Sequence, residues 1–368
     1  MKNKITFIIG TKAELIKCMP IMLELQKQDI PYFFIHTGQH NLGEACVEFK
    51  IKKPDYVLSK EPAKSTKFWS KINSNSISWC FSMIPKIKKL LKEIQPSYVI
   101  YHGDTMSSAV AAMASSNLFN SNKTWKNVHL EAGLRSGSLF EPFPEEISRR
   151  ICDKFSDILF AVSDFTEETL RNKYKKKDII NVGNTIIDSI YIINEKIKEK
   201  QFPVPKEYAL INIHRHENLR SKKRMQSIVN VIKEINLPII WPLHDNTKLF
   251  LEKYGLMEEL EELDFLYIFP LMSYSTFIFL MSKCKYLVTD GGSIQEESLV
   301  FKKPCILLRK LTERQEGLAT GINFLINFDE NYAKEVIEKI ESNKLKVAYF
   351  RNPYGVQGLS KDIVEILK

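Results

Sequence analysis

The sequence contains little glycine, little proline and no paired cysteine motif. Its 368 residues include 14 glycines and 15 prolines, too few for a collagen-like or low-complexity chain. The six cysteines are scattered without a CxxC pair, which argues against a disulfide framework or a zinc ribbon. Scattered thiols are typical of a reducing compartment, so we expect a cytoplasmic protein.

Long hydrophobic runs are also scarce. Residues 265–282 are nearly long enough to span a bilayer, but Pro270 and the polar residues 273–276 interrupt them. We predict a buried strand, a capped turn and an apolar helix face there, and no membrane insertion. The apolar run Ile5–Ile9 is short and lacks the cleavage site of a signal peptide, so it is interpreted as a buried first strand.

The chain carries 53 basic and 44 acidic residues, a net charge of +9. Such a charge can attract polyanions. The basic runs 173–177 and 222–224 are short and far apart in the sequence, which favours solvated lysine-rich faces over a nucleic-acid surface. The length and the hydrophobic share of 44% indicate a globular protein of two domains.

Short apolar runs alternate with amphipathic segments. The predicted strands are 5–9, 32–36, 98–102, 128–131, 158–162, 179–182, 208–213, 238–242, 266–269, 286–289 and 305–308. The predicted helices include 13–26, 82–93, 107–116, 145–155, 165–172, 222–234 and 293–301. Because unbroken apolar strands are buried on both faces, the pattern indicates an α/β fold with parallel sheets.

A domain boundary is indicated near residues 188–207. A polar helix from Asp188 to about Lys200 runs into residues 201–205, where Pro203 and Pro205 cannot continue it. We therefore predict two Rossmann-like, doubly wound lobes, residues 1–188 and 189–354, with a cleft between them.

One candidate binding site is a glycine turn at the end of a predicted strand, where ligands of open parallel sheets bind. The backbone N–H groups of Gly291, Gly292 and Ser293 could hold a diphosphate, and Glu297 could bind ribose hydroxyls. The alternative is an ordinary Gly-Gly turn with Ser293 as a helix N-cap. Basic residues at other strand ends favour the phosphate site: Lys12, Lys17, Arg135 and His214.

Three carboxylates, Asp104, Glu131 and Glu145, follow neighbouring strands of the first lobe. Carboxylates crowded in a cleft can exchange protons near neutrality. The alternative is that Asp104 and Glu131 cap helices while Glu145 pairs with Arg149. A metal site is less favoured, because two histidines at positions 214 and 216 of an extended strand end point to opposite faces.

These segments resemble a known family. GTKAELIK, HTGQH, HGDT, HLEAGLR, PFPEE, VGNTIID, HRHEN, PLHDN, TDGGSIQEES, LTERQE and RNPYG occur in the order and approximate spacing of the non-hydrolysing UDP-N-acetylglucosamine 2-epimerases of bacteria and archaea. The resemblance covers essentially the whole chain. It implies a glycosyltransferase-B-like (GT-B-like) arrangement of the lobes, a C-terminal helix 355–368 that completes the first lobe, and a homodimer.

The resemblance also implies a reaction. The family interconverts UDP-GlcNAc and UDP-ManNAc by anti-elimination of UDP, through 2-acetamidoglucal, without a metal or a nicotinamide cofactor. Asp104, Glu131 and Glu145, with Lys17 nearby, are implied to move the proton at C2, in an order that stays open. His214, Lys12 and the turn Gly291–Ser293 are implied to hold the diphosphate. The remaining implied substrate-binding residues are Arg135, His244, Asn246, Glu297 and Arg314.

Departures from the family pattern keep alternatives open. The usual GTRPE loop is GTKAE here, so Lys12 stands where the family has arginine. The substrate could thus be another UDP-2-acetamido sugar. A hydrolysing epimerase that releases ManNAc and UDP is a second alternative, against which the QEE helix start and TERQE argue. A GT-B glycosyltransferase would leave the three acids unexplained, and a non-catalytic sugar-nucleotide or nucleic-acid binder lacks a supporting motif.

Overall fold

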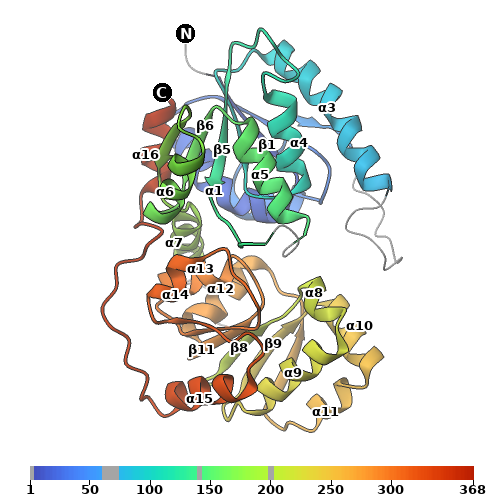
Figure 1. Cartoon of the computed structure of the whole chain (residues 1–368), viewed down its shortest axis with the longest axis vertical. Coiled ribbons are helices and arrows are strands. Elements are labelled where there is room, and N and C mark those ends of the chain that lie inside the picture. Colours follow the sequence, from blue (N-terminus) through green and yellow to red (C-terminus); the bar gives the residue numbers. More distant parts are fainter. Residues whose placement is uncertain (1–3, 60–73, 139–142, 198–202) are drawn as a thin grey trace. The chain divides into compact units, whose positions relative to one another are not determined.

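The computed structural model describes residues 4–59, 74–138, 143–197 and 203–368 (Figure 1). The chain forms two compact units, one made of residues up to 189 together with 353–368, the other of residues 190–352. Each unit contains one parallel sheet with its own core, and the two Rossmann-like lobes predicted from the sequence are confirmed.

The first unit is built on seven parallel strands in the order β3-β2-β1-β4-β5-β6-β7. This order places β1 and β4 at the centre, where the direction of winding reverses and ligands commonly bind. The strands are β1 (Ile5–Ile9), β2 (Tyr32–His36), β3 (Tyr56–Val57), β4 (Tyr98–His102), β5 (Lys126–Ala132), β6 (Ile158–Ala161) and β7 (Asp178–Asn181).

Helices connect these strands, and polar caps fix where they begin. The helices are α1 (Lys12–Lys27), α2 (Gly43–Phe49), α3 (Ser74–Ile94), α4 (Met106–Ser115), α5 (Glu145–Phe155), α6 (Asp164–Lys173) and α7 (Ile186–Ile197). Thr11 and Thr105 accept hydrogen bonds from backbone N–H groups at the starts of α1 and α4. Both helices therefore begin directly beyond the carboxyl ends of the central strands.

The last helix, α16 (Leu359–Leu367), belongs to the first unit and packs against α1 (Figure 1). The Asp188 carboxylate accepts hydrogen bonds from the backbone N–H groups of Gly358 and Ser360, both at 2.7 Å, and from the Ser360 hydroxyl at 2.6 Å. A carboxylate at this place satisfies otherwise unpaired N–H groups of the helix start. Asp188 thus anchors the end of the chain to α7.

The second unit repeats the architecture with six parallel strands in the order β10-β9-β8-β11-β12-β13. They are β8 (Ala209–Asn212), β9 (Ile239–Leu243), β10 (Leu266–Pro270), β11 (Tyr286–Thr289), β12 (Cys305–Leu307) and β13 (Asn323–Leu325). The helices are α8 (His216–Leu219), α9 (Lys222–Lys233), α10 (Asp245–Tyr254), α11 (Met257–Glu261), α12 (Tyr274–Lys283), α13 (Ile294–Val300), α14 (Gln315–Ala319) and α15 (Glu330–Glu341).

Several expectations need correction. The strand at 266–269 was expected to be buried, but β10 is a sheet edge on which Tyr267 is 47% exposed. His216 begins helix α8 instead of extending a strand, so the alternation argument against a metal site does not apply. The helix expected from Asp188 begins two residues earlier, and residues 198–200 of that prediction lie outside the described residues. Among the described residues, no helix is long and apolar enough to cross a membrane.

Candidate active site

The carboxyl ends of β1, β4 and β5 meet at one edge of the first sheet, because β4 pairs in parallel with both neighbours. Glu131 lies in a β-bulge at the end of β5, where the register with β6 shifts between Leu130 and Ala132. Its φ of 70° is unusual for a residue other than glycine. A bulge redirects a side chain, and such strain is common at functional sites.

The Glu131 carboxylate is buried against cationic and polar groups. Lys17 Nζ forms an ion pair with it, Asn184 Nδ2 donates to it at 3.0 Å, and His102 Nε2 lies 3.4 Å from it. The side chains of Lys17 and Glu131 are each 6% exposed. Burial lowers the pKa of His102, so Lys17 supplies the positive charge that faces Glu131 near neutral pH.

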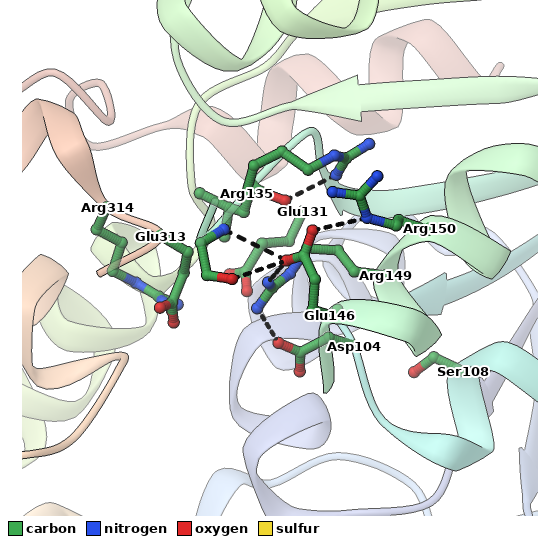
Figure 2. Close-up of polar contacts among 12 residues, drawn as sticks. Asp104, Ser108, Glu131, Arg135, Glu146, Arg149, Arg150, Glu313 and Arg314 are labelled. Carbon is green, nitrogen blue, oxygen red and sulfur yellow. Dashed lines mark hydrogen bonds and ion pairs between the residues drawn. The ribbon is translucent and has the colours of Figure 1, made fainter. Parts of the chain in front are cut away.

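Asp104 follows β4 and is bound by a buried arginine of α5 (Figure 2). Arg149 Nη2 contacts the Asp104 carboxylate, while Nη1 donates to Glu146 at 2.6 Å. The Asp104 side chain is 28% exposed, whereas that of Arg149 is 1% exposed. Arg149 thus binds one side of the Asp104 carboxylate, and the rest of that side chain is accessible to solvent.

These contacts add to the alternative offered from the sequence. Glu146, three residues before Arg149, is a partner of Arg149 on α5, and both side chains are buried. Thr105, not Asp104, caps α4. Glu145 is the first residue of α5, with a partly buried side chain. The catalytic roles of Asp104, Glu131, Glu145 and Lys17 stay predictions.

His129, Asp153 and Arg135 form a cluster that contacts the backbone of Gly103, the residue before Asp104. His129 Nδ1 is 2.7 Å from Asp153 Oδ1, and its Nε2 is 2.8 Å from the carbonyl oxygen of Gly103. Arg135, predicted to bind substrate, forms an ion pair with the other Asp153 oxygen, and its side chain is 14% exposed. Burial alone would raise the pKa of Asp153, but the hydrogen bond and charge of His129 and the charge of Arg135 lower it.

Glu14 is a fourth acid of this edge that the sequence analysis did not select. Its carboxylate accepts the Gly10 N–H at 2.7 Å and the hydroxyl of Thr105, so it joins the turns after β1 and β4. Burial raises the pKa of Glu14 to about 7. The GTKAE segment contains Glu14, but a glutamate in the first turn of a helix ordinarily indicates a favourable charge at the helix start, not a buried group.

The folding stability of the protein is expected to fall as pH rises because of Glu14. The unfolded chain releases this proton near the ordinary pKa of 4.5, whereas the folded chain keeps it up to about 7. The folded state is therefore favoured at low pH and loses about 2–3 kcal/mol between pH 4.5 and 7.5. Urea unfolding of wild type and of Glu14→Gln measures the free energy of unfolding across this pH range. The wild type should show the loss of stability, and the variant should not. Glu44→Gln, an exposed acid of α2, is the control, and equal pH slopes in wild type and Glu14→Gln would contradict the expectation.

In the second unit, Asp290 orders the turn after β8. This fully buried carboxylate accepts the backbone N–H groups of His214 and Arg215 and the side-chain amide of Asn218, each at 3.0 Å. The His214 ring stacks on His244 with centroids 5.0 Å apart. Burial, followed by the charge of His214, lowers the pKa of His244 to about 4. His244 is therefore neutral near pH 7 and can stack without charge repulsion.

The glycine turn after β11 has a different local structure from that expected. Ser293 stands at the N-cap position of α13, as the alternative predicts, but it has helical φ and ψ of −64° and −29°, and its side chain makes no capping hydrogen bond. A Cβ on Gly292 would lie 3.2 Å from Arg314 Nη1 and from Glu313 Oε1, and 3.4 Å from Arg215 Nη2. The Gly292 backbone is thus approached by charged side chains.

The other predicted residues of the second unit differ in burial. Glu297 is 2% exposed and accepts the Tyr274 hydroxyl at 2.9 Å. Arg314 is buried in ion pairs with Glu296, at 2.8 Å, and with Glu313. Asn246 is exposed in the first turn of α10. In the first unit, Lys12 is the first residue of α1 and is half-buried.

The chain matches known proteins over almost its whole length. A UDP-N-acetylglucosamine 2-epimerase homolog of Methanococcus maripaludis is 32% identical, with 99% of both chains covered. A UDP-2,3-diacetamido-2,3-dideoxy-D-glucuronate 2-epimerase of Pseudomonas aeruginosa is 30% identical, with 88% of both covered. The structure of UDP-GlcNAc 2-epimerase from Neisseria meningitidis, bound to UDP-GlcNAc, has a TM-score of 0.84 at 31% identity and covers 99% of both chains. The family model described as UDP-N-acetylglucosamine 2-epimerase matches residues 23–368. The chain belongs to the UDP-N-acetylglucosamine 2-epimerase family.

Proposed function

We propose that this protein is a non-hydrolysing UDP-GlcNAc 2-epimerase that interconverts UDP-GlcNAc and UDP-ManNAc. One observation carries the proposal: Asp104 and Glu131 end adjacent strands, and each carboxylate contacts a buried cation, Arg149 or Lys17. Cations that contact these carboxylates fix their orientation, and proton transfer requires groups held in a fixed orientation. Family membership favours this function over the glycosyltransferase and the non-catalytic binder.

The proposed reaction needs a base on one face of the sugar and an acid on the other. A carboxylate removes the C2 proton, the C–H electron pair forms the C1=C2 bond, and the C1–O bond breaks with its electrons leaving on UDP. The second acid then protonates C2 of 2-acetamidoglucal from the opposite face, and a UDP oxygen attacks C1. We assign these transfers to Asp104, Glu131 and Glu145 as a group.

The second unit supplies the proposed nucleotide site. A leaving diphosphate gains negative charge as C1–O breaks, and preorganised N–H groups and cations stabilise such charge. Residues of the strand ends of β8, β9 and β11 fit this role: His214 with Asp290 behind it, His244, and the turn Gly291–Ser293. Catalysis requires both units to act on one substrate molecule, and the GT-B-like cleft stays a prediction.

Incubation of the enzyme with UDP-GlcNAc in D₂O tests the proposal. The mechanism predicts UDP-ManNAc and UDP-GlcNAc that both carry deuterium at C2, because C2 loses its proton in forming the glucal and receives a new one from a carboxylic acid that has exchanged with solvent. NMR of the sugar region measures this directly. Epimer formation with the original hydrogen retained would overturn the mechanism, and free ManNAc with UDP as the sole products would identify a hydrolysing epimerase.

Gly292→Val is expected to weaken UDP binding by about tenfold or more, equivalent to at least ~1.4 kcal/mol. Its Cβ would lie within 3.4 Å of Arg215, Glu313 and Arg314, and the branched side chain would also obstruct a ligand that approaches the backbone. Calorimetric titration with UDP measures the loss, and thermal unfolding checks that the variant is folded. A folded variant with unchanged affinity would remove this turn from the proposed site.

A second substrate is favoured by two observations. The Pseudomonas aeruginosa relative is named for a diacetamido uronate, and Lys12 replaces the arginine of the usual first loop. Lysine offers one point charge where arginine offers a planar fork, so recognition near this loop can differ. Comparing kcat/KM for UDP-GlcNAc and for UDP-2,3-diacetamido-2,3-dideoxyglucuronate distinguishes the two substrates.

The proposal extends to a homodimer that acts in the cytoplasm on precursors of surface polysaccharide. Its support is the family resemblance alone. Light scattering of the purified protein tests the dimer.

A further inference from the structure

His129 lies in β5 with its ring fully buried between two hydrogen-bond acceptors. Its Nε2 is 2.8 Å from the carbonyl oxygen of Gly103, and its Nδ1 is 2.7 Å from Asp153 Oδ1. A carbonyl oxygen can only accept. The Asp153 carboxyl also only accepts when ionised, and its second oxygen already binds the guanidinium of Arg135.

Two acceptors require two donors. A neutral imidazole has one N–H and one lone pair, so either neutral tautomer would direct a nitrogen lone pair at an oxygen lone pair. In a site without exposed surface, that repulsion cannot be relieved by water. Only the doubly protonated ring satisfies both contacts.

We propose that His129 is a constitutive imidazolium that positions the catalytic turn Gly103–Asp104. Gly103 is held on both sides by β5: its N–H donates to the carbonyl oxygen of Leu130 at 2.9 Å, and its carbonyl accepts from His129. Its φ of 72° is one that glycine adopts readily. The following residue, Asp104, is thereby presented to Arg149. The positioning role rests on the proposed function of Asp104, whereas the charge state of His129 does not.

The charges around His129 fit this state. Asp153 of α5 supplies the negative charge, and Arg135, which shares it, is partly solvated. On the neighbouring strand, Tyr101 stacks on the His129 ring with centroids 6.0 Å apart, and its hydroxyl bonds to Ser156. His102, which follows Tyr101 in β4, has a lowered pKa. Burial is the largest cause; Glu131 opposes it, and the charges of Lys17 and His129 lower the pKa further. Lys177 donates to the backbone carbonyl of Asp153, so it leaves that carboxylate to His129 and Arg135.

Nitrogen-15 NMR of the histidine rings in the wild-type protein tests the charge state. The chain has seven histidines, and His129 is assigned by the shift of its signals in Tyr101→Phe, which changes the ring stacked on it. We expect both His129 nitrogens of the folded protein to give the signals of protonated nitrogens. One unprotonated His129 nitrogen in the folded protein would overturn the proposal.

Kinetics of His129→Gln test the positioning role. Glutamine can donate to Gly103 or to Asp153 but cannot carry the charge, so we expect kcat to fall about 10- to 100-fold through a displaced Asp104, with UDP affinity unchanged. Tyr101→Phe is the matched control, because it removes a buried hydrogen bond from the same ring stack without touching Gly103. Equal losses of kcat in both variants, or unchanged kcat in a folded His129→Gln, would overturn the positioning role. Absence of deuterium incorporation by the wild type would instead defeat the proposed function and leave the NMR result standing.

Discussion

Asp104→Asn is expected to lower kcat by about 10²- to 10⁴-fold, the usual contribution of a general acid or base. Asparagine has the shape of aspartate and can still accept from Arg149, but it can neither take nor give the C2 proton. UDP affinity should change little, because the proposed nucleotide site lies in the second unit. Steady-state kinetics with UDP-GlcNAc and calorimetry with UDP measure the two quantities separately. Glu131→Gln and Glu145→Gln are expected to have effects of the same kind.

The matched control for Asp104 is Asp178→Asn. Asp178 begins β7 at the opposite edge of the same sheet, and its ion pair with Lys126 is exposed, with side chains 61% and 57% accessible. Its replacement should leave kcat unchanged. Near-normal turnover in all three active-site variants would remove the proposed mechanism, whereas loss of UDP binding in Asp104→Asn would indicate a misfolded turn.

Lys17→Met is expected to destabilise the first unit by about 3–5 kcal/mol, because it leaves the buried carboxylate of Glu131 without its cation. Asn184 and His102 remain beside that carboxylate, but Asn184 brings no charge and burial favours the neutral form of His102. Denaturation in guanidinium chloride, monitored by aromatic fluorescence, gives the free energy of unfolding. Two units can unfold in separate transitions, so the change should appear in one of them.

Two further variants calibrate the Lys17 result. Lys126→Met breaks an exposed ion pair with Asp178 and should cost less than about 1 kcal/mol. The double variant Lys17→Met with Glu131→Leu removes both buried charges and should recover most of the stability while remaining inactive. A loss in Lys17→Met no larger than that in Lys126→Met would mean that water reaches Glu131.

The central strands were predictable from the sequence because each is an unbroken apolar run. Such runs are typical of strands in a parallel sheet that helices cover on both faces. Tyr32–His36 and Tyr98–His102, for example, have the predicted bounds. The edge strands β3 and β13 were missed, since strands of two and three residues carry too few apolar side chains for a pattern.

The site was predictable only to the level of residue types at strand ends. That Glu14 turns inward to bond Gly10, and that Arg149 bonds both Glu146 and Asp104, depends on the rotation of α1 and α5 about their axes. Residues three and four positions apart are both neighbours on a helix surface, so helix periodicity alone does not predict which of them form a pair. Likewise, no local signal distinguishes the His129 ring from any other buried strand residue.

The return of α16 to α1 makes the second unit an insertion within the first. During synthesis the ribosome therefore completes residues 190–352 before the helix that closes the earlier unit emerges. A chain truncated after residue 352 and released from the ribosome should hold a protease-resistant second unit, while the face of α1 that α16 covers stays exposed. In this interval Asp188 has no helix start to bind, and the first-made unit is the last to mature.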